Sequence, residues 1–180
     1  SFWKAFICIV FIAALGNSVI SFAKDFALSV NATASLATTL VGVLSVFNGI
    51  GRIVTGALYD ALGRKITMVA ANCLTVVAAI MCLASVYTSS LPLCIIALCL
   101  TGLSYGSCPT VTSAFTASFY GRKNFATYYS INNFNLIFAS FIANASNSLL
   151  AGTNSFFAPF LMLLVLSVLA LIINLTIIKP

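Results

Sequence analysis

The chain has no histidine and no glutamate, and its only acidic residues are Asp25 and Asp60. General acid–base catalysis usually relies on a histidine or on a pair of carboxylates, so we do not expect an enzyme. For the same reason we expect no metal site and no cofactor. The six cysteines form no Cys-x-x-Cys pair and lie in apolar segments. We therefore interpret them as small buried hydrophobic residues.

Charged residues are also scarce, at 6% of the 180 residues, whereas hydrophobic residues make up 62%. Soluble domains carry roughly 25% charged residues, and polar groups could not cover the surface of a soluble fold of this composition. The apolar runs last about 20 residues, as a bilayer-spanning helix requires, and lack the alternation over about 10 residues that is typical of outer-membrane strands. The sequence therefore predicts an all-α membrane protein.

The apolar segments predict six transmembrane helices within a single domain over residues 1–180. The expected spans are approximately 5–28, 35–59, 66–87, 91–117, 125–148 and 156–178. Short breaks rich in turn-forming residues separate them, so successive helices should be antiparallel. The chain begins at Ser1 instead of a methionine, which we interpret as a sign of an internal piece of a longer protein.

Basic residues near the ends of these spans predict the orientation in the membrane. With six spans, one side receives six bases: Lys4, Arg64, Lys65, Arg122, Lys123 and Lys179. The other side receives only Lys24, which stands beside Asp25. Basic residues collect on the cytoplasmic side. We therefore expect a multi-pass protein of the cell (inner) membrane with both ends of this segment in the cytoplasm.

Arg52 departs from this pattern because it lies inside an apolar span, in the stretch FNGIGRIVTGALYDALGRK. It precedes Asp60 by eight residues, which places it about 12 Å deep in a hydrocarbon core about 30 Å thick. A charge near the midplane costs at least about 2.5–3.5 kcal/mol, so a functional role is the first hypothesis. Neither acid reaches it easily, and Asn48, one turn earlier, is uncharged. Its partner should be water, backbone carbonyls, an acid elsewhere in the protein or an anionic ligand.

Small residues flank Arg52 at three positions: Gly49, Gly51 and Gly56. Gly49 and Gly56 lie seven apart, roughly on one helical face, where they would allow close helix approach or leave room beside the guanidinium. Gly102 and Gly106 form a Gly-x-x-x-Gly pattern around Tyr105. This second pattern suits either a helix-packing face or the lining of a cavity.

The fifth expected span contains three polar residues on one face. Tyr128, Asn132 and Asn135 follow each other at i, i+4 and i+7. A buried asparagine in lipid must find hydrogen-bond partners. A wet cavity and interhelical hydrogen bonds explain them equally well.

The motif Gly56-x-x-x-Asp60-x-x-Gly63-Arg64-Lys65 resembles the loop between the second and third helices of each half of major facilitator superfamily transporters. That resemblance implies a gating role for these five residues. Asp60 would either pair with Arg64 at i+4 or cap a helix N-terminus across the two halves, where its charge suits the helix dipole.

A wider stretch, including GLSYGSCPTVTSAFTASFYGRKNFATYYSI, resembles the C-terminal half of the oxalate/formate antiporter family, a relative of the monocarboxylate transporters. The resemblance implies that the six spans are helices seven to twelve of a secondary transporter. It also implies a substrate site shared with an N-terminal six-helix half, and an arginine, matching Arg52, that holds the substrate carboxylate. The oxalate transporters carry a lysine where this chain has Asn135 or Leu136, which favours a monocarboxylate over a dianion.

The expected binding residues are therefore six: Arg52, Asn48, Tyr105, Tyr128, Asn132 and Asn135. The expected partners are a small organic anion, the N-terminal half and the lipid bilayer, with self-association of the isolated half as a further option and no nucleic acid. Two other functions remain open at this point. One is transport of a neutral or cationic solute, with Arg52 paired to an acid in the other half. The other is a six-helix membrane assembly unit without transport.

Overall fold

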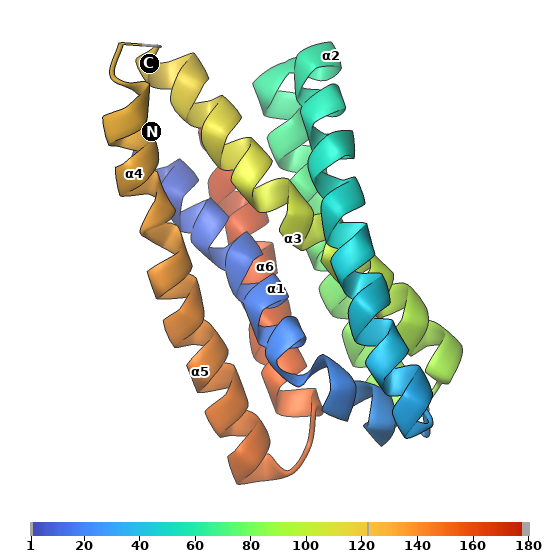
Figure 1. The fold of residues 1–180 in the computed structure, drawn as a ribbon. Coiled ribbons are helices and arrows are strands. Elements are labelled where there is room, and N and C mark those ends of the chain that lie inside the picture. Colours follow the sequence, from blue (N-terminus) through green and yellow to red (C-terminus); the bar gives the residue numbers. More distant parts are fainter. Residues whose placement is uncertain (1, 122, 178–180) are drawn as a thin grey trace.

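A computed structural model of the chain describes residues 2–121 and 123–177. Its six helices are α1 (Phe2–Ser29), α2 (Ala34–Thr88), α3 (Leu91–Tyr120), α4 (Phe125–Asn133), α5 (Asn135–Thr153) and α6 (Phe157–Leu175), arranged as Figure 1 shows. The expected all-α class is confirmed, and five of these segments are long and apolar enough to cross a membrane, with α4 and α5 taken together. Arg122 and Lys179, expected among the bases of one side, lie outside the described residues.

Helix α2 is a hairpin. Its 55 residues would extend about 80 Å if straight, far more than a bilayer core of about 30 Å. The chain reverses at Gly63, whose φ of 73° and ψ of 177° fall in a region that only glycine adopts easily. Residues 51–58 and 67–74 then line one common cavity with α3. The two arms correspond to the expected spans 35–59 and 66–87.

The expected span 125–148 is interrupted near its middle and ends later than predicted. Helix α4 stops at Asn133 and α5 begins at Asn135, continuing to Thr153. At the junction, the amide of Phe134 donates to the carbonyl of Ile131, three residues back, at 3.2 Å. This single tightened turn keeps a right-handed helical conformation at Phe134, so α4 and α5 form one span.

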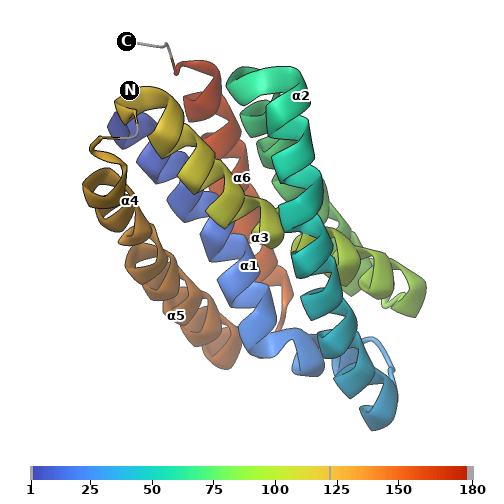
Figure 2. The same cartoon turned by 45° about the horizontal axis from the view of Figure 1, so that its top comes forward.

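Helix α1 is the centre of the bundle and the most buried candidate span. It contacts α2, α3, α5 and α6, and Figure 2 shows it between α5 on one side and α2 on the other. It bends at Phe22, where φ is −124° and ψ is 18°. The ring of Phe22 lies 5.6 Å from that of Phe160, and Phe26 lies 4.8 Å from the same ring. These aromatic contacts fix the bent end of α1 against α6.

The closest helix packing joins the first arm of α2 to α3. A Cβ atom added at Gly106 would collide with the carbonyl oxygen of Asn48, and one added at Gly51 would collide with the carbonyl oxygen of Leu103. A Cβ at Gly102 would lie 2.9 Å from the Cβ of Phe47. The Gly-x-x-x-Gly pattern is therefore a packing face, where small residues let two backbones approach.

The close approach does not use the glycines predicted for it on α2. Nothing lies within 4 Å of a Cβ built at Gly49, and Gly56 would make only an ordinary 3.8 Å contact with Thr110. Of the two roles left open for these glycines, close helix approach does not occur among the described residues. The face of α2 that meets α3 is set by Gly51, two positions along the helix from Gly49, and Gly49 instead faces open space.

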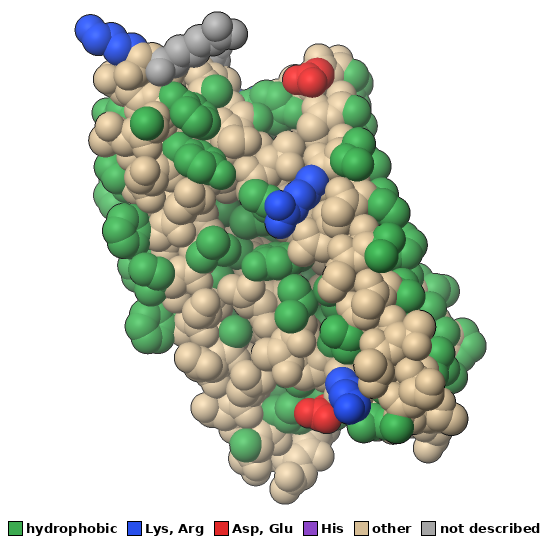
Figure 3. All heavy atoms as spheres, in the orientation of Figure 1, with side chains coloured by type: hydrophobic (Ala, Val, Ile, Leu, Met, Phe, Trp, Pro, Cys, Tyr) green, Lys and Arg blue, Asp and Glu red, His purple; other side chains and the backbone are tan. Residues whose placement is uncertain are grey.

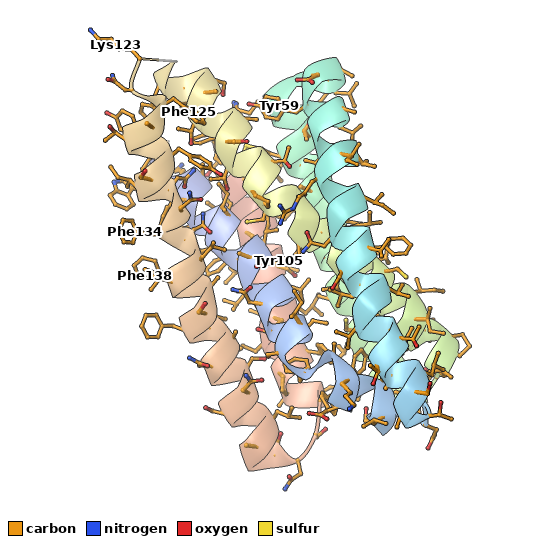
Figure 4. The ribbon with its side chains drawn as sticks, viewed as in Figure 1. Tyr59, Tyr105, Lys123, Phe125, Phe134 and Phe138 are labelled. Carbon is orange, nitrogen blue, oxygen red and sulfur yellow. The ribbon has the colours of Figure 1, made fainter. Side chains whose placement is uncertain are left out.

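The start of α1 and the end of α6 lie at the same end of the bundle (Figure 1). Lys4 donates to the carbonyl and the hydroxyl of Thr176 at 3.3 and 3.1 Å, which ties the start of α1 to the end of α6. Arg64 and Lys65 follow the reversal of α2, and Lys123 lies at the same end, before α4 (Figure 4). The grouping of these bases matches the expectation, while their placement in the cytoplasm stays a prediction.

Candidate functional site

Arg52 lies on the first arm of α2, eleven residues before the reversal at Gly63, or about 16 Å along the helix. Its side chain is exposed in this chain, and Figure 3 shows a basic patch midway between the two ends, over α2 and α3. The Nε atom donates to Oδ1 of Asn48, one turn earlier, at 3.3 Å. Within the described residues this is the only hydrogen bond of the guanidinium, so no carboxylate neutralises it there.

A cavity of about 90 Å³ adjoins this guanidinium. It is formed by the first arm of α2, by α3 and by the α4–α5 junction. Its lining consists of eight residues: Arg52, Tyr105, Cys108, Pro109, Thr112, Asn133, Asn135 and Leu136. The structure thus brings together three of the six expected binding residues and places Asn48 directly behind Arg52.

Tyr105 is held in the cavity wall by a glycine of α1. Its ring packs against Gly16 so closely that a Cβ atom there would overlap the ring. Figure 4 shows Tyr105 in the middle of the bundle, where α3 passes α1. The role of Gly16 was not predicted, because nothing in the sequence indicates which helix meets Tyr105.

Three further lining residues on α3 were missed, although the sequence contains a signal for them. Tyr105, Cys108, Pro109 and Thr112 follow each other at i, i+3, i+4 and i+7, which puts them on one helical face. Pro109 has no amide hydrogen, so it cannot make the usual helix hydrogen bond to the carbonyl of Tyr105. The face of α3 that lines the cavity therefore also contains a position where one backbone hydrogen bond of the helix is missing.

Of the three polar residues expected to share a face, only Asn135 reaches the cavity. Asn132 is fully buried and donates from Nδ2 to the Thr116 hydroxyl of α3 at 3.4 Å. Tyr128 stacks on Tyr120, with ring centroids 3.9 Å apart. All three residues lie on the side of the segment that faces α3, but only Asn135 lines the cavity. Interhelical bonding explains Asn132, and the cavity explains Asn135.

Two buried amide oxygens at this junction have no protein partner. Asn135 is 1% exposed and donates from Nδ2 to the backbone oxygen of Asn132, which leaves its Oδ1 unpaired. Oδ1 of Asn132 is unpaired as well. A flip of that amide is disfavoured, because the Thr116 hydroxyl already donates its hydrogen to Thr112 at 2.7 Å and can only accept from Asn132. Because only Asn135 lines the cavity, the site contains one cationic donor and one unsatisfied acceptor.

The Asp60–Lys65 motif forms the reversal of α2, and one expected contact in it does not form. Pairing of Asp60 with Arg64 at i+4 requires a continuous helix, and Gly63 breaks the helix between them. The Arg64 guanidinium instead lies 5.0 Å from the ring centre of Phe119, near the end of α3. A cation above an aromatic face is attracted to it. Arg64 therefore holds the reversal of α2 against α3 and does not bond to the preceding arm of α2.

Comparison with known families gives one match. The model of the Major Facilitator Superfamily matches residues 6–180, which is nearly the whole chain. No curated protein sequence matches the chain closely enough to count as a relative. The family match agrees with the hairpin at Gly63, where the resembling loop motif lies.

Proposed function

We propose that small organic anions are the substrates of this chain, which belongs to the major facilitator superfamily and is therefore a multi-pass membrane transporter and not an enzyme. In this proposal the anion is a carboxylate, carried by alternating access as in oxalate/formate-type antiport or monocarboxylate transport. The observation that carries the proposal is the uncompensated guanidinium of Arg52 at the wall of a cavity.

The chemistry of Arg52 favours a carboxylate. Its Nε is occupied by Asn48, so the two terminal nitrogens remain free to donate together. A guanidinium presents parallel N–H donors that match the two oxygens of a carboxylate. Removal of a charged group from water is costly, and a bound anion offsets that cost where no protein acid does.

The number of charges favours a monoanion. Arg52 is the only charged residue among the eight that line the cavity, and the α4–α5 wall offers Asn133, Asn135 and Leu136 instead of a second base. One fixed cation compensates one carboxylate. The cavity of about 90 Å³ on this chain has room for an anion of a few heavy atoms.

We further propose that an N-terminal six-helix half of the same transporter covers Arg52 and completes the site. Substrate sites of such transporters lie between two repeats near the bilayer midplane. The exposure of Arg52, about 16 Å along the helix from the reversal at Gly63, supports that arrangement. In the same proposal, the basic end of the bundle lies on the cytoplasmic side of the cell membrane. The mass of the purified protein in detergent separates this arrangement from self-association of two copies.

Counterflow uptake of carboxylates into liposomes containing the full-length protein tests the substrate class. Arg52→Ala should reduce uptake about 10- to 100-fold, because a lost charge-assisted hydrogen bond costs about 1.5–3 kcal/mol. Lys24→Ala, an exposed base at the opposite end, is the matched control and should leave uptake unchanged. Unchanged uptake in Arg52→Ala would remove the proposed role of that residue. Uptake of neutral or cationic solutes alone would refute the substrate class.

A further inference from the structure

The geometry points to a substrate that carries a hydrogen-bond donor beside its carboxylate, held by Arg52 at one end and by Asn135 at the other. The inference rests on the proposed function, since it describes the ligand of the same site. The site should therefore bind short hydroxycarboxylates more tightly than simple carboxylates of the same size.

The main observation is the unsatisfied oxygen of Asn135. This side chain is 1% exposed, lines the cavity, and has no partner for Oδ1. Its orientation is set by the donation from Nδ2 to the backbone oxygen of Asn132, because a flipped amide would place two acceptors against each other. Buried polar groups in proteins nearly always have a partner. An acceptor held in this way at a cavity wall requires a donor from what fills the cavity.

None of the neighbouring lining residues donates to Oδ1 of Asn135, and this includes Tyr105, whose hydroxyl is not bonded to it. The Thr112 hydroxyl gives its hydrogen to the carbonyl of Cys108 at 2.8 Å. The Cys108 thiol points to the carbonyl of Ile9 on α1, at 4.0 Å. Asn133 also lines the cavity, but it is exposed, so water can satisfy its amide. Arg52 supplies donors only, as a guanidinium has no acceptor.

The cavity thus has a cationic donor from α2 and a neutral acceptor from α5. A carboxylate accepts hydrogen bonds from Arg52 but has no hydrogen to donate to Asn135, because an ionised carboxylate is acceptor-only. A hydroxyl on the adjacent carbon supplies the missing donor within a ligand small enough for about 90 Å³. A site built to bond a hydroxyl discriminates strongly against the analogue that lacks it, because its own buried group is then left unpaired.

Glycolate and propionate form the test pair, since they have the same number of heavy atoms and differ by a hydroxyl in place of a methyl group. Their dissociation constants are measured by calorimetric titration of the purified full-length protein. Glycolate should bind roughly tenfold more tightly, as expected for one satisfied neutral hydrogen bond. Equal binding, or tighter binding of propionate, would overturn the inference and show that water satisfies Asn135.

The variant Asn135→Leu assigns the preference to this side chain. It should weaken glycolate binding roughly tenfold and leave propionate binding equal or tighter, so that the preference disappears. Asn144→Leu, an exposed asparagine of the same helix, is the matched control and should retain the preference. A preference that survives in Asn135→Leu contradicts the inference. If that variant does not fold, the comparison of the two acids on the unaltered protein still decides.

The same titrations separate this inference from the proposed function. If glycolate and propionate bind equally, and Arg52→Ala abolishes the binding of both, the anion site stands and only the donor requirement fails. If neither acid binds the unaltered protein, both the proposed function and the inference fail.

Discussion

Replacement of Gly106 by alanine tests the contact on which the site depends. The added Cβ would collide with the carbonyl oxygen of Asn48, and it would lie 3.0 Å from the carbonyl carbon of that residue and 3.1 Å from Cα of Gly51. Ordinary contacts of this kind begin at 3.4 Å, and all three atoms belong to the backbone of α2. A side-chain rotation cannot relieve the overlap, so the two helices must separate.

The expected cost follows from two opposing terms. Overpacking of a tight contact costs about 1–3 kcal/mol. An alanine in a helix is itself favoured over glycine by roughly 0.5–1 kcal/mol. The matched control Gly42→Ala isolates the first term, because nothing lies within 4 Å of its Cβ and the same propensity gain applies. The two variants should therefore differ by about 1–3 kcal/mol.

Thermal unfolding of both variants in detergent measures that difference. For a protein of this length, 1 kcal/mol corresponds to about 2–4 °C in the unfolding midpoint. Gly106→Ala should also slow carboxylate uptake, since the displaced carbonyl belongs to Asn48, whose side chain orients Arg52. Equal midpoints for Gly106→Ala and Gly42→Ala would show that α2 and α3 are not in close contact at this point, and the packing argument would be wrong.

Two other glycine substitutions give distinct outcomes. Gly16→Ala should lower the unfolding midpoint and reduce carboxylate uptake roughly tenfold, measured in detergent and in liposomes, because the new Cβ overlaps the Tyr105 ring and lies 2.6 Å from Cβ of Tyr105, which no rotation of that side chain can move. Gly63→Ala should lower stability by about 1–3 kcal/mol, measured by thermal unfolding, because φ of 73° with ψ of 177° is strained for any side chain. Gly152→Ala, with open space around its Cβ, is the control for both, and parity with it would contradict either expectation.

The membrane character and the unusual position of Arg52 could be predicted because both depend on local composition. A bilayer accepts only long apolar helices, so hydropathy alone predicts where they occur. The helix reversal was equally predictable, since Gly63 stands among polar residues between two apolar runs. The family signature at the same place agreed with the match over residues 6–180.

The predictions that failed all concern which face of a helix meets which neighbour. Gly49 and Gly56 were expected either to allow close helix approach or to leave room beside the guanidinium, and the close approach occurs at Gly51 instead. Of the two roles left open for Asp60, pairing with Arg64 is excluded, because the broken helix leaves Arg64 against Phe119. In each case the residue types were suitable, and a rotation of the helix or a break in it decided the outcome. The spacing of residues along the sequence does not show how a helix is rotated about its own axis relative to its neighbours.

The sequence by itself determined that this chain has membrane-spanning segments and that one of them contains a cation, because the free energy of inserting each residue depends on that residue and its depth. Only the tertiary structure decided what surrounds that cation. The contact of α2 with α3, the turn between α4 and α5, and the glycine under Tyr105 together place one guanidinium and one unsatisfied amide oxygen at the same cavity. These are contacts between residues far apart in the sequence, and they depend on how the helices pack.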